Sequence, residues 1–564
     1  MNKSKKILLA TLLATSMTSA MTSVQADGFF SKLFSSSTEG ASFKSLISHV
    51  PENTAYFFGN EKAMPDDVLS FHLQRAQELM KMISELEEKN KDKKELTGAD
   101  KFFKTLLTDI STHYADKKFE ATGLSLKPTF MVYGLDSLPI ARLGFADKTK
   151  LMETIKRAEK ESDYKIDFQK CGDYDCFIDE GKDDNLVAMV ILKDHIAASL
   201  FSKSDKEKVI NHIIGKSMPK TAYSLKKWDT FLEDNNYKGY GDGFISLKNL
   251  SGTLKPMIMQ GFAKKVDPKE LEGCLAVAQA HIDNMPEIIM GSKKLEVKNM
   301  DYEVVLKTST DVSNTLQTIA NKTNIANRAA NPIIDVGVNV NFMKLRDALT
   351  QYANFLIKSG EANKCSSIEP TKIRKGMGGL MMAMNMGLTQ FKSIYASVSE
   401  IELDDQMKPS KVDAYLSIGT DDPAGLLGMV SMMSPKLMGF KLPSDGTAVK
   451  LPDGAIPTKG QPLPDIYLSR SDKSLNIMVG NNKPKLKFYK KTVPEITSFS
   501  MDMKRYYKKL ASIMSKIPRQ KGKDEDGEKV IKMMGSIGDM MGEYQQEVIA
   551  DKRGLVINYH VNYQ

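Results

Sequence analysis

Three segments of this chain begin with an alternating strand pattern and pass directly into an amphipathic helix pattern, and this repetition limits the fold more than any other feature. The segments are residues 243–264, 335–358 and 498–516. In the second segment Val336, Val338 and Val340 alternate with glycine and asparagine, which predicts a half-buried strand. The apolar residues that follow have the spacing of one helical face: Phe342, Leu345, Leu349, Ala353 and Leu356.

A second helix and then a pair of strands follow each of these units. The pattern predicts them at residues 274–307, 372–418 and 529–563, and a fourth copy starts with the strand at residues 54–58. Each predicted sheet has one apolar face, which we expect the helices of the same copy to cover. The fold class predicted is α+β, with repeated β-α-α-β-β modules that form antiparallel or mixed sheets and helices packed on one face.

The copies differ in length, and the difference suggests a duplicated pair of modules. The first and third copies continue into extra strands, whereas the second ends in a polar link at residues 322–332. We therefore expect two pseudo-equivalent halves. The N-terminal half is residues 27–330, with modules at about 50–230 and 240–330, and the C-terminal half is residues 331–564, with modules at about 331–492 and 493–564.

The N-terminus has the three parts of a cleavable signal peptide. Lys3, Lys5 and Lys6 precede an apolar stretch at residues 7–13, and small and polar residues then lead to Ala26. The apolar stretch is shorter than the ~20 residues that span a bilayer, and no later stretch of that length lacks charges. We expect residues 1–26 to be removed and the mature protein to lie in the periplasm without spanning the membrane.

Four cysteines follow the predicted signal peptide, and an even number in an exported chain favours disulfides. Cys171 and Cys176 flank a Gly-Asp turn between two strand patterns, so we expect a local bridge between them. That leaves Cys274 with Cys365, each placed before the second helix of neighbouring copies. A bridge between those two would join the two halves.

The sequence contains no recognisable constellation for catalysis, metal binding or a cofactor. The seven histidines lack the spacing of a metal site, and the stretch before Lys216 and Ser217 has Ile210 where a phosphate loop needs glycine. The 79 basic and 70 acidic residues are spread along the chain, so no nucleic-acid partner is expected. An enzyme whose site is assembled from distant residues remains the first alternative.

Methionine is the one compositional peculiarity, with 34 residues that gather in a few predicted helices. Three interpretations stand side by side: a helix core, an adaptable groove for an apolar ligand or a partner's apolar segment, and a copper(I) site built from thioethers. The copper interpretation lacks a nearby His or Cys. The residues that would line the groove are Met377, Met381, Met382, Met384, Met429, Met432 and Met433.

A motif in the first half adds a resemblance. The stretch from Gly123 to Arg142, with Pro128, Gly134 and Pro139, is followed by Asp147 and resembles a segment of exported bacterial proteins of unknown function built from strand-helix repeats. Those proteins also share a Pro-x-x-Thr start, here Pro51 to Thr54. The resemblance implies an envelope protein and assigns no catalytic residue.

These observations predict a non-enzymatic binding or interaction protein of the periplasm. Its partner is expected to be a lipid, another apolar ligand or another envelope protein, held in the methionine-rich groove. No cofactor is expected.

Overall fold

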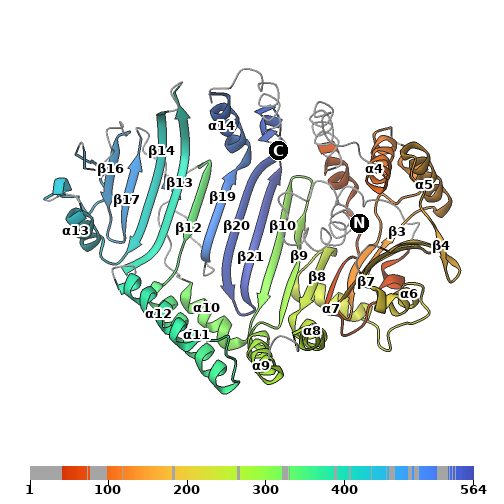
Figure 1. Cartoon of the computed structure of the whole chain (residues 1–564). Coiled ribbons are helices and arrows are strands. Elements are labelled where there is room, and N and C mark those ends of the chain that lie inside the picture. The colour runs from red at the N-terminus through yellow and green to blue at the C-terminus, as the bar shows by residue number, and fades with distance from the viewer. Residues whose placement is uncertain are drawn as a thin grey trace. The chain divides into compact units, whose positions relative to one another are not determined.

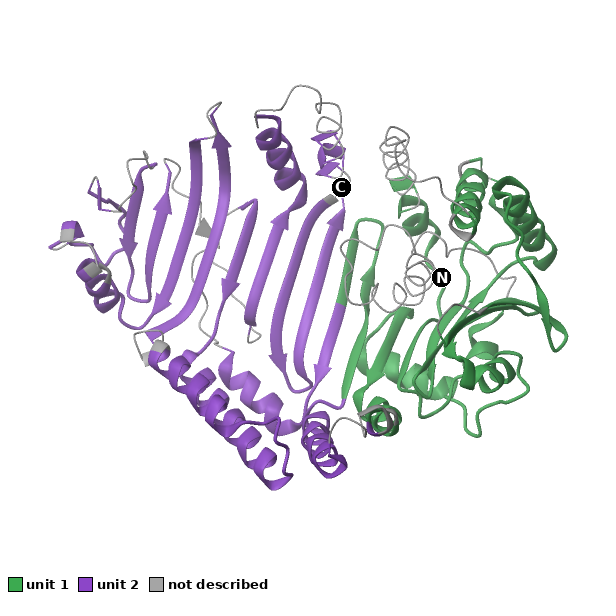
Figure 2. Cartoon of the chain, in the orientation of Figure 1, with its two compact units in different colours: residues 1–258, 287–302 green, residues 259–286, 303–564 purple. Residues whose placement is uncertain are grey.

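The computed structural model of the chain combines helices with a large antiparallel sheet, so the fold class is α+β (Figure 1). Contacts between Cα atoms divide the chain into two compact units, coloured separately in Figure 2: unit 1 is residues 1–258 and 287–302, and unit 2 is residues 259–286 and 303–564. The structure describes residues 41–563 except 73, 76–97, 117, 181–183, 263–266, 321–327, 330, 386–389, 405–407, 434, 438, 453, 456–463, 481–485, 488–494, 517–530, 533, 537 and 540. The predicted signal peptide, residues 1–26, lies outside the described residues.

Unit 1 consists of a sheet and the helices packed on it. Its strands are β1 (Tyr56–Asn60), β2 (Phe130–Leu135), β3 (Leu138–Gly144), β4 (Gln169–Cys171), β5 (Tyr174–Glu180), β6 (Asn185–Ile191), β7 (His195–Ser202), β8 (Tyr240–Ser246), β9 (Glu287–Leu295) and the start of β10 (Asn299–Lys307). Its helices are α2 (Phe43–Ile47), α4 (Ala99–Ala115), η1 (Phe119–Thr122), α5 (Lys148–Ser162), η2 (Lys203–Asp205), α6 (Lys206–Ile213) and α7 (Leu225–Asn235), and α8 (Leu247–Phe262) continues into unit 2. The strands are ordered β4-β5-β6-β7-β3-β2-β1-β8-β9-β10.

Unit 2 repeats the combination of long strands and helices. Its helices are α9 (Pro268–Asn284), α10 (Thr310–Ile319), α11 (Phe342–Ala362), α12 (Pro370–Asn385), α13 (Pro423–Met433), η4 (Pro435–Leu437) and α14 (Met503–Lys516). Its main strands are β12 (Ile334–Val338), β13 (Phe391–Leu403), β14 (Pro409–Thr420), β15 (Val449–Lys450), β16 (Ile466–Arg470), β17 (Ser474–Val479), β19 (Glu495–Asp502), β20 (Met541–Asp551) and β21 (Gly554–Tyr563), and β11 (Arg328–Ala329) pairs with β18 (Leu486–Lys487). The strands are ordered β10-β21-β20-β19-β12-β13-β14-β17-β16-β15.

The three strand-to-helix transitions predicted from the sequence are present as β8–α8, β12–α11 and β19–α14. Local chemistry explains where two of the helices begin. The Asn341 side chain accepts from the amide of Lys344 at the start of α11, and the Asp147 side chain does the same for Lys150 at the start of α5. These caps satisfy amides that the helix itself leaves without a partner.

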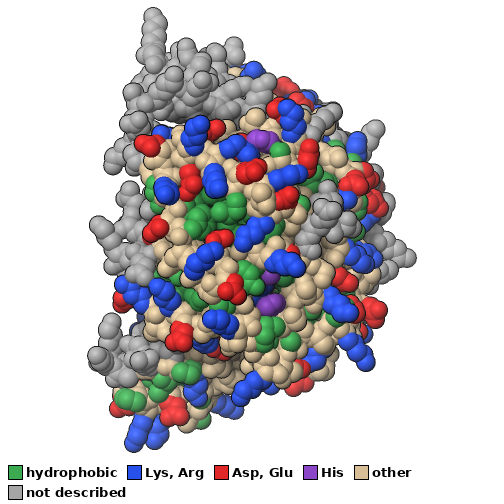
Figure 3. Space-filling view, turned by 90° about the vertical axis from the view of Figure 1, so that its right-hand side faces the viewer, with side chains coloured by type: hydrophobic (Ala, Val, Ile, Leu, Met, Phe, Trp, Pro, Cys, Tyr) green, Lys and Arg blue, Asp and Glu red, His purple; other side chains and the backbone are tan. Residues whose placement is uncertain are grey.

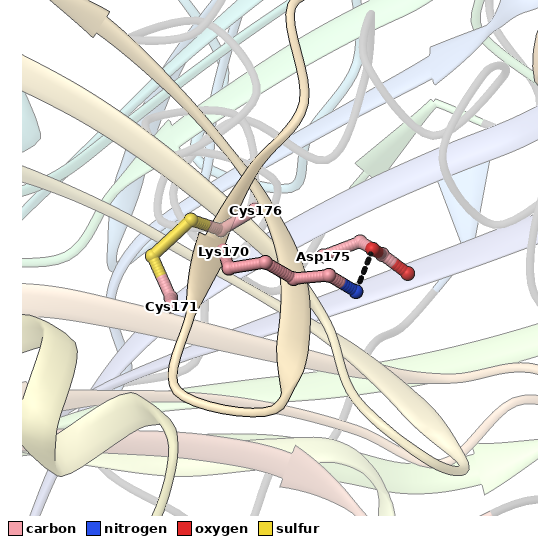
Figure 4. The surroundings of a disulfide bond; sticks show 4 residues. All are labelled: Lys170, Cys171, Asp175 and Cys176. Carbon is pink, nitrogen blue, oxygen red and sulfur yellow. Dashed lines mark hydrogen bonds and ion pairs between the residues drawn. A yellow bond between two sulfur atoms is a disulfide. The ribbon is translucent and has the colours of Figure 1, made fainter.

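Both predicted disulfides are present. Cys171 and Cys176 join β4 to β5, with Cα atoms 5.8 Å apart, and Lys170 and Asp175 pair directly beside them (Figure 4). Cys274 in α9 is joined to Cys365, which lies in the turn between α11 and α12. Such bridges persist in oxidising compartments, which agrees with export of the chain.

The described residues contain no helix that is both long and apolar enough to cross a membrane.

Candidate functional site

The sheet of unit 2 has two chemically different faces, and the register of its strands defines them. Val336 of β12 lies opposite Ala396 of β13 on one side and opposite Phe499 of β19 on the other. Partners in register point to the same face of an antiparallel sheet. Extending this rule across five strands places the following side chains together, and we call them the open apolar face: Ile394, Ala396, Val398, Ile334, Val336, Val338, Thr497, Phe499, Met501, Tyr544, Gln546, Val548, Ile557, Tyr559 and Val561.

None of the side chains of the open apolar face is buried. Val336, in the middle strand of the five, is 46% exposed, although a residue with paired strands on both sides is normally covered on its apolar face. Phe499 and Tyr544 lie with their ring centroids 6.0 Å apart, so aromatic rings form part of the surface. Partial burial raises the pKa of Tyr544 to about 12, and the hydroxyl therefore stays protonated at neutral pH.

The opposite face of the same strands is mostly polar, and its buried part lies on β12, β13 and β19. Asp335, Tyr395 and Ser498 of these strands are at most 6% exposed. Hydrogen bonds between neighbouring strands make this burial tolerable, because a buried polar group costs little once it has a partner. The hydroxyls of Tyr415 and Ser417 of β14 both donate to the side-chain Oδ1 of Asn476 of β17, at 3.0 and 2.7 Å. The Ser500 hydroxyl donates to the Asp335 carboxylate.

The open apolar face ends where helix α13 covers it. Ile418 and Ile477, which extend the same face onto β14 and β17, pack with Leu426 and Leu427 of α13 in a buried cluster. The sequence predicted that the helices of each copy would cover its apolar face. In unit 2 helix α10 contacts β20 and β21, and helix α14 contacts β13, β19 and β20, but the side chains of the open apolar face stay partly exposed. Helix α11, which follows β12, packs against the helices α9, α10 and α12.

The methionines predicted to line a groove are placed on two helices with different neighbours. Ile373, Met377, Met381 and Met384 form one stripe of α12, and α12 packs against α11. Met429 packs into the cluster under α13, whereas Met382 is 69% and Met432 is 76% exposed. The side chain of Met433 lies outside the part of the chain that the structure describes. A groove between α12 and α13 stays a prediction.

A second polar cluster, in unit 1, was not found from the sequence. Arg142 of β3, only 1% exposed, donates through Nε to the Tyr133 hydroxyl at 3.0 Å and through Nη1 to His195 Nε2 at 2.7 Å. Its Nη2 donates to the carbonyls of His212 and Ile213 at the end of α6. A cation at the carboxyl end of a helix is electrostatically favourable.

The hydrogen bonds fix how the two histidines are protonated. Arginine can only donate, so His195 Nε2 accepts and its Nδ1 donates to Asp194 at 2.8 Å. Tyr133 accepts from Arg142 and donates to His212 Nε2 at 2.8 Å, so His212 Nδ1 donates to the Ser217 carbonyl. Both imidazoles are therefore neutral in this arrangement.

Burial and the positive charge of Arg142 lower the pKa of both imidazoles and so favour their neutral forms. Burial is the largest cause that lowers the pKa of His212, to about 4, and that of His49, to about 3, and the charge of Arg142 acts in the same direction. The ring of His49 lies 6.4 Å from those of His195 and His212. On the molecular face drawn in Figure 3, histidine side chains reach the surface among hydrophobic and basic ones. The cluster braces α6 against the sheet and is sensitive to protonation.

No group of three or more His, Cys, Asp or Glu side chains within the described residues is placed to hold a metal ion. A cavity of 190 Å³ lies between the end of β13 and α14, where Lys509 pairs with Glu402. Ligand pockets usually measure about 300–1,000 Å³, so this cavity is too small to serve as one.

In comparisons with known proteins, no family model, no curated protein and no solved structure matches the chain.

Proposed function

We propose that the chain is exported to the periplasm and acts there as a non-enzymatic binding protein for a ligand with an acyl chain, which lies on the open apolar face of unit 2. The observation that carries the proposal is that Val336 is 46% exposed and the other side chains of the open apolar face are partly exposed, although Asp335 on the other side of the same strand is buried. Leaving apolar area in water costs about 25 cal/mol per Å². A ligand that covers the open apolar face would bury this area, and the free energy released would favour binding.

The dimensions of the open apolar face support an acyl chain. Five strands at a spacing of about 4.8 Å extend over about 19 Å across the sheet. The hydrocarbon of one bilayer leaflet is about 15 Å deep, half of the ~30 Å core, and that is the length of a typical acyl chain. The face has few groups that would need polar partners. Thr497, Gln546, Tyr544 and Tyr559 carry its only side-chain hydrogen-bonding atoms.

Two further observations support the location and the domain organisation. The pattern at residues 1–26 and the two disulfides agree with a periplasmic protein.

The strand order supports two pseudo-equivalent halves. In the first, the order is β6-β7-β3-β2-β1-β8-β9-β10, and in the second it is β16-β17-β14-β13-β12-β19-β20-β21. In each half the first strand in the sequence, β1 or β12, lies inside the sheet. The later strands of the half are then added on its two sides in the same sequence.

Binding of cis-parinaric acid, whose fluorescence rises in an apolar site, tests the proposal. The probe is titrated at concentrations below those at which it forms micelles. Val336→Asp is expected to weaken binding at least about tenfold, equal to about 1.4 kcal/mol, because a carboxylate would then lie under the acyl chain. Far-UV circular dichroism checks that the variant is folded.

Met382→Asp is the matched control, because it introduces the same charge at an even more exposed apolar residue of α12. We expect its affinity for the probe to equal that of the wild type. Loss of binding in Met382→Asp with none in Val336→Asp would move the ligand to the methionine-rich helices. No saturable binding by the wild type would refute the proposal.

A further inference from the structure

Helix α12 turns a set of positive charges and exposed apolar side chains away from the rest of unit 2. Its less exposed residues, Ile373, Met377, Met381 and Met384, recur at three- and four-residue spacing and form the stripe through which an amphipathic helix packs. Helix α12 packs in this way against α11. Lys375 and Met382 lie on the other side of the helix and are exposed.

All the charged side chains of α12 are basic. Lys372, Arg374 and Lys375 are exposed, and the helix contains no Asp or Glu. Lys372 forms an ion pair with Glu369, which lies just before the helix. Cations near the amino end of a helix oppose the helix dipole, so this placement lowers the stability of the isolated helix. Because these charges lower the stability of the helix, we infer that they have another role, namely binding a partner.

The same helix exposes apolar surface. Leu380 is 36% and Met382 is 69% exposed. The helix pair α11–α12 carries four of the seven large apolar side chains found exposed in the described part of the chain, the other two on this pair being Met343 and Tyr352. An added Cβ at Gly376, Gly378 or Gly379 would meet nothing within 4 Å, so the helix backbone itself is open to close approach.

The helix pair is held firmly enough to present this surface. The disulfide from Cys365 to Cys274 ties the turn between α11 and α12 to α9. Next to it, an added Cβ at Gly360 would come within 2.9 Å of two atoms of Ile368, so the turn packs closely on α11. His281 of α9 also contacts Phe355 of α11, with ring centroids 5.2 Å apart.

We propose that α12 docks on the surface of a membrane that contains anionic phospholipids, with Lys372 and Lys375 at the phosphates and Met382, on the same side of the helix, inserted between the acyl chains. Arg374 adds to the positive charge beside this side of the helix. A basic helix with exposed apolar side chains has the chemistry of an interfacial helix. Charge complementarity favours this partner over an apolar protein segment, which would offer no counter-charge to Arg374 and Lys375. The inference deepens the proposed function and rests on it, since it names the surface where the acyl ligand is taken up or delivered.

Co-sedimentation of the full mature protein with vesicles tests the proposal. Vesicles of phosphatidylglycerol and phosphatidylethanolamine are compared with vesicles of phosphatidylcholine alone. Each basic residue near an anionic surface contributes about 1 kcal/mol, so the triple variant Lys372→Gln, Arg374→Gln, Lys375→Gln is expected to lose at least about tenfold in partitioning to the anionic vesicles. Met382→Asp is expected to lose binding as well.

Two controls separate docking from general effects of charge and exposed apolar area. Lys44→Gln, Lys226→Gln, Lys238→Gln removes the same charge from exposed residues of unit 1, and Met432→Asp changes an exposed methionine of α13. Both are expected to sediment like the wild type. Equal losses in the controls, equal binding to phosphatidylcholine vesicles, or no vesicle binding at all would each overturn the inference.

The acyl-chain assay keeps the two proposals distinguishable. The α12 variants are expected to bind cis-parinaric acid normally, while Val336→Asp is expected to sediment normally with anionic vesicles. If the probe binds at Val336 and the α12 variants still sediment, the docking inference fails alone. If the α12 variants lose the vesicles and the wild type binds no probe, the proposed function fails instead.

Discussion

The two units build their sheets from similar strands but cover them differently. In unit 1 the consecutive residues Tyr56, Phe57 and Phe58 of β1 are all buried, so both faces of that strand are covered. Trp228 of α7 lies on one face, with its ring centroid 4.8 Å from that of Phe57. In unit 2 the strand β12, which occupies the corresponding place in its strand order, buries Asp335 and exposes Val336.

The difference in cover arises from where the helices of each unit pack. The helices of unit 1 complete a core: α4 and α5 form a buried cluster with Ile191 of β6, in which Phe102 and Leu151 take part. In unit 2 helix α11 packs on the helices α9, α10 and α12, while α10 and α14 contact strands of the sheet without burying the open apolar face. A unit that completes its core gains stability from the apolar area it buries, whereas an apolar face left partly in water does not contribute that free energy to folding.

The largest expected effect concerns the disulfide of unit 2. Replacing Cys274 and Cys365 by serine opens a loop with a sequence separation of 91, for which chain entropy predicts a loss of about 4–5 kcal/mol. The same change at Cys171 and Cys176, with a separation of 5, is expected to cost about 2 kcal/mol.

Two probes assign these losses to the units during urea denaturation. Trp228 is the single tryptophan of the chain and lies buried in unit 1, while far-UV circular dichroism reports both units. The first pair of substitutions should shift the dichroism transition more than the Trp228 transition, and the second pair should shift the Trp228 transition. Identical shifts of both signals in either variant would mean that the units unfold as one body.

A second effect follows from the histidine cluster of unit 1. The folded-state pKa values of His49, about 3, and His212, about 4, lie below the ordinary 6.5, so the unfolded chain binds more protons between pH 6.5 and about 4. The free energy of unfolding therefore has its full value above pH 6.5 and decreases as the pH drops through that range. The urea midpoint reported by Trp228 measures it.

His49→Gln removes one of these groups and is expected to flatten the pH dependence of that midpoint. His281→Gln, in unit 2, is the matched control and should leave it unchanged. An equally steep dependence in His49→Gln would contradict the assignment of acid sensitivity to the cluster.

The smallest expected effect compares one valine from each unit. Val132→Thr places a hydroxyl at a residue of β2 that is 2% exposed, and we expect a loss of about 1–3 kcal/mol. Val336→Thr makes the same change at 46% exposure, where water can satisfy the hydroxyl, and we expect a change within about 0.5 kcal/mol. Urea denaturation measures both. Equal losses at the two positions would show that the apolar face of unit 2 is covered in solution.

Much of the local structure could be predicted from the sequence. Alternation and helical spacing located β12 and α11, and the turn at Gly172 was enough to pair Cys171 with Cys176. Alternation also separates the two faces of a strand. It does not say which face is buried, and Val336 and Asp335 have the opposite placement from the one that hydrophobicity alone suggests. The polar face could be buried because Ser500 and Asn476 supply hydrogen bonds from other strands.

The histidine cluster could not be predicted, because its members are far apart in the sequence. His49, His195 and His212 share no spacing that marks a site, and only the pairing of β3 with β2 and β7 brings Arg142 and Tyr133 to them. A buried arginine within an apolar strand pattern was the one available signal, at Ile140 to Leu143.

The sequence by itself determined which segments become strands and helices, and that Cys171 pairs with Cys176, because spacing, caps and turns act over a few residues. Only the tertiary structure decided which face of each sheet meets water and which charges share a buried site. Those outcomes depend on partners from distant segments, whose hydrogen bonds and packing outweigh the local preference.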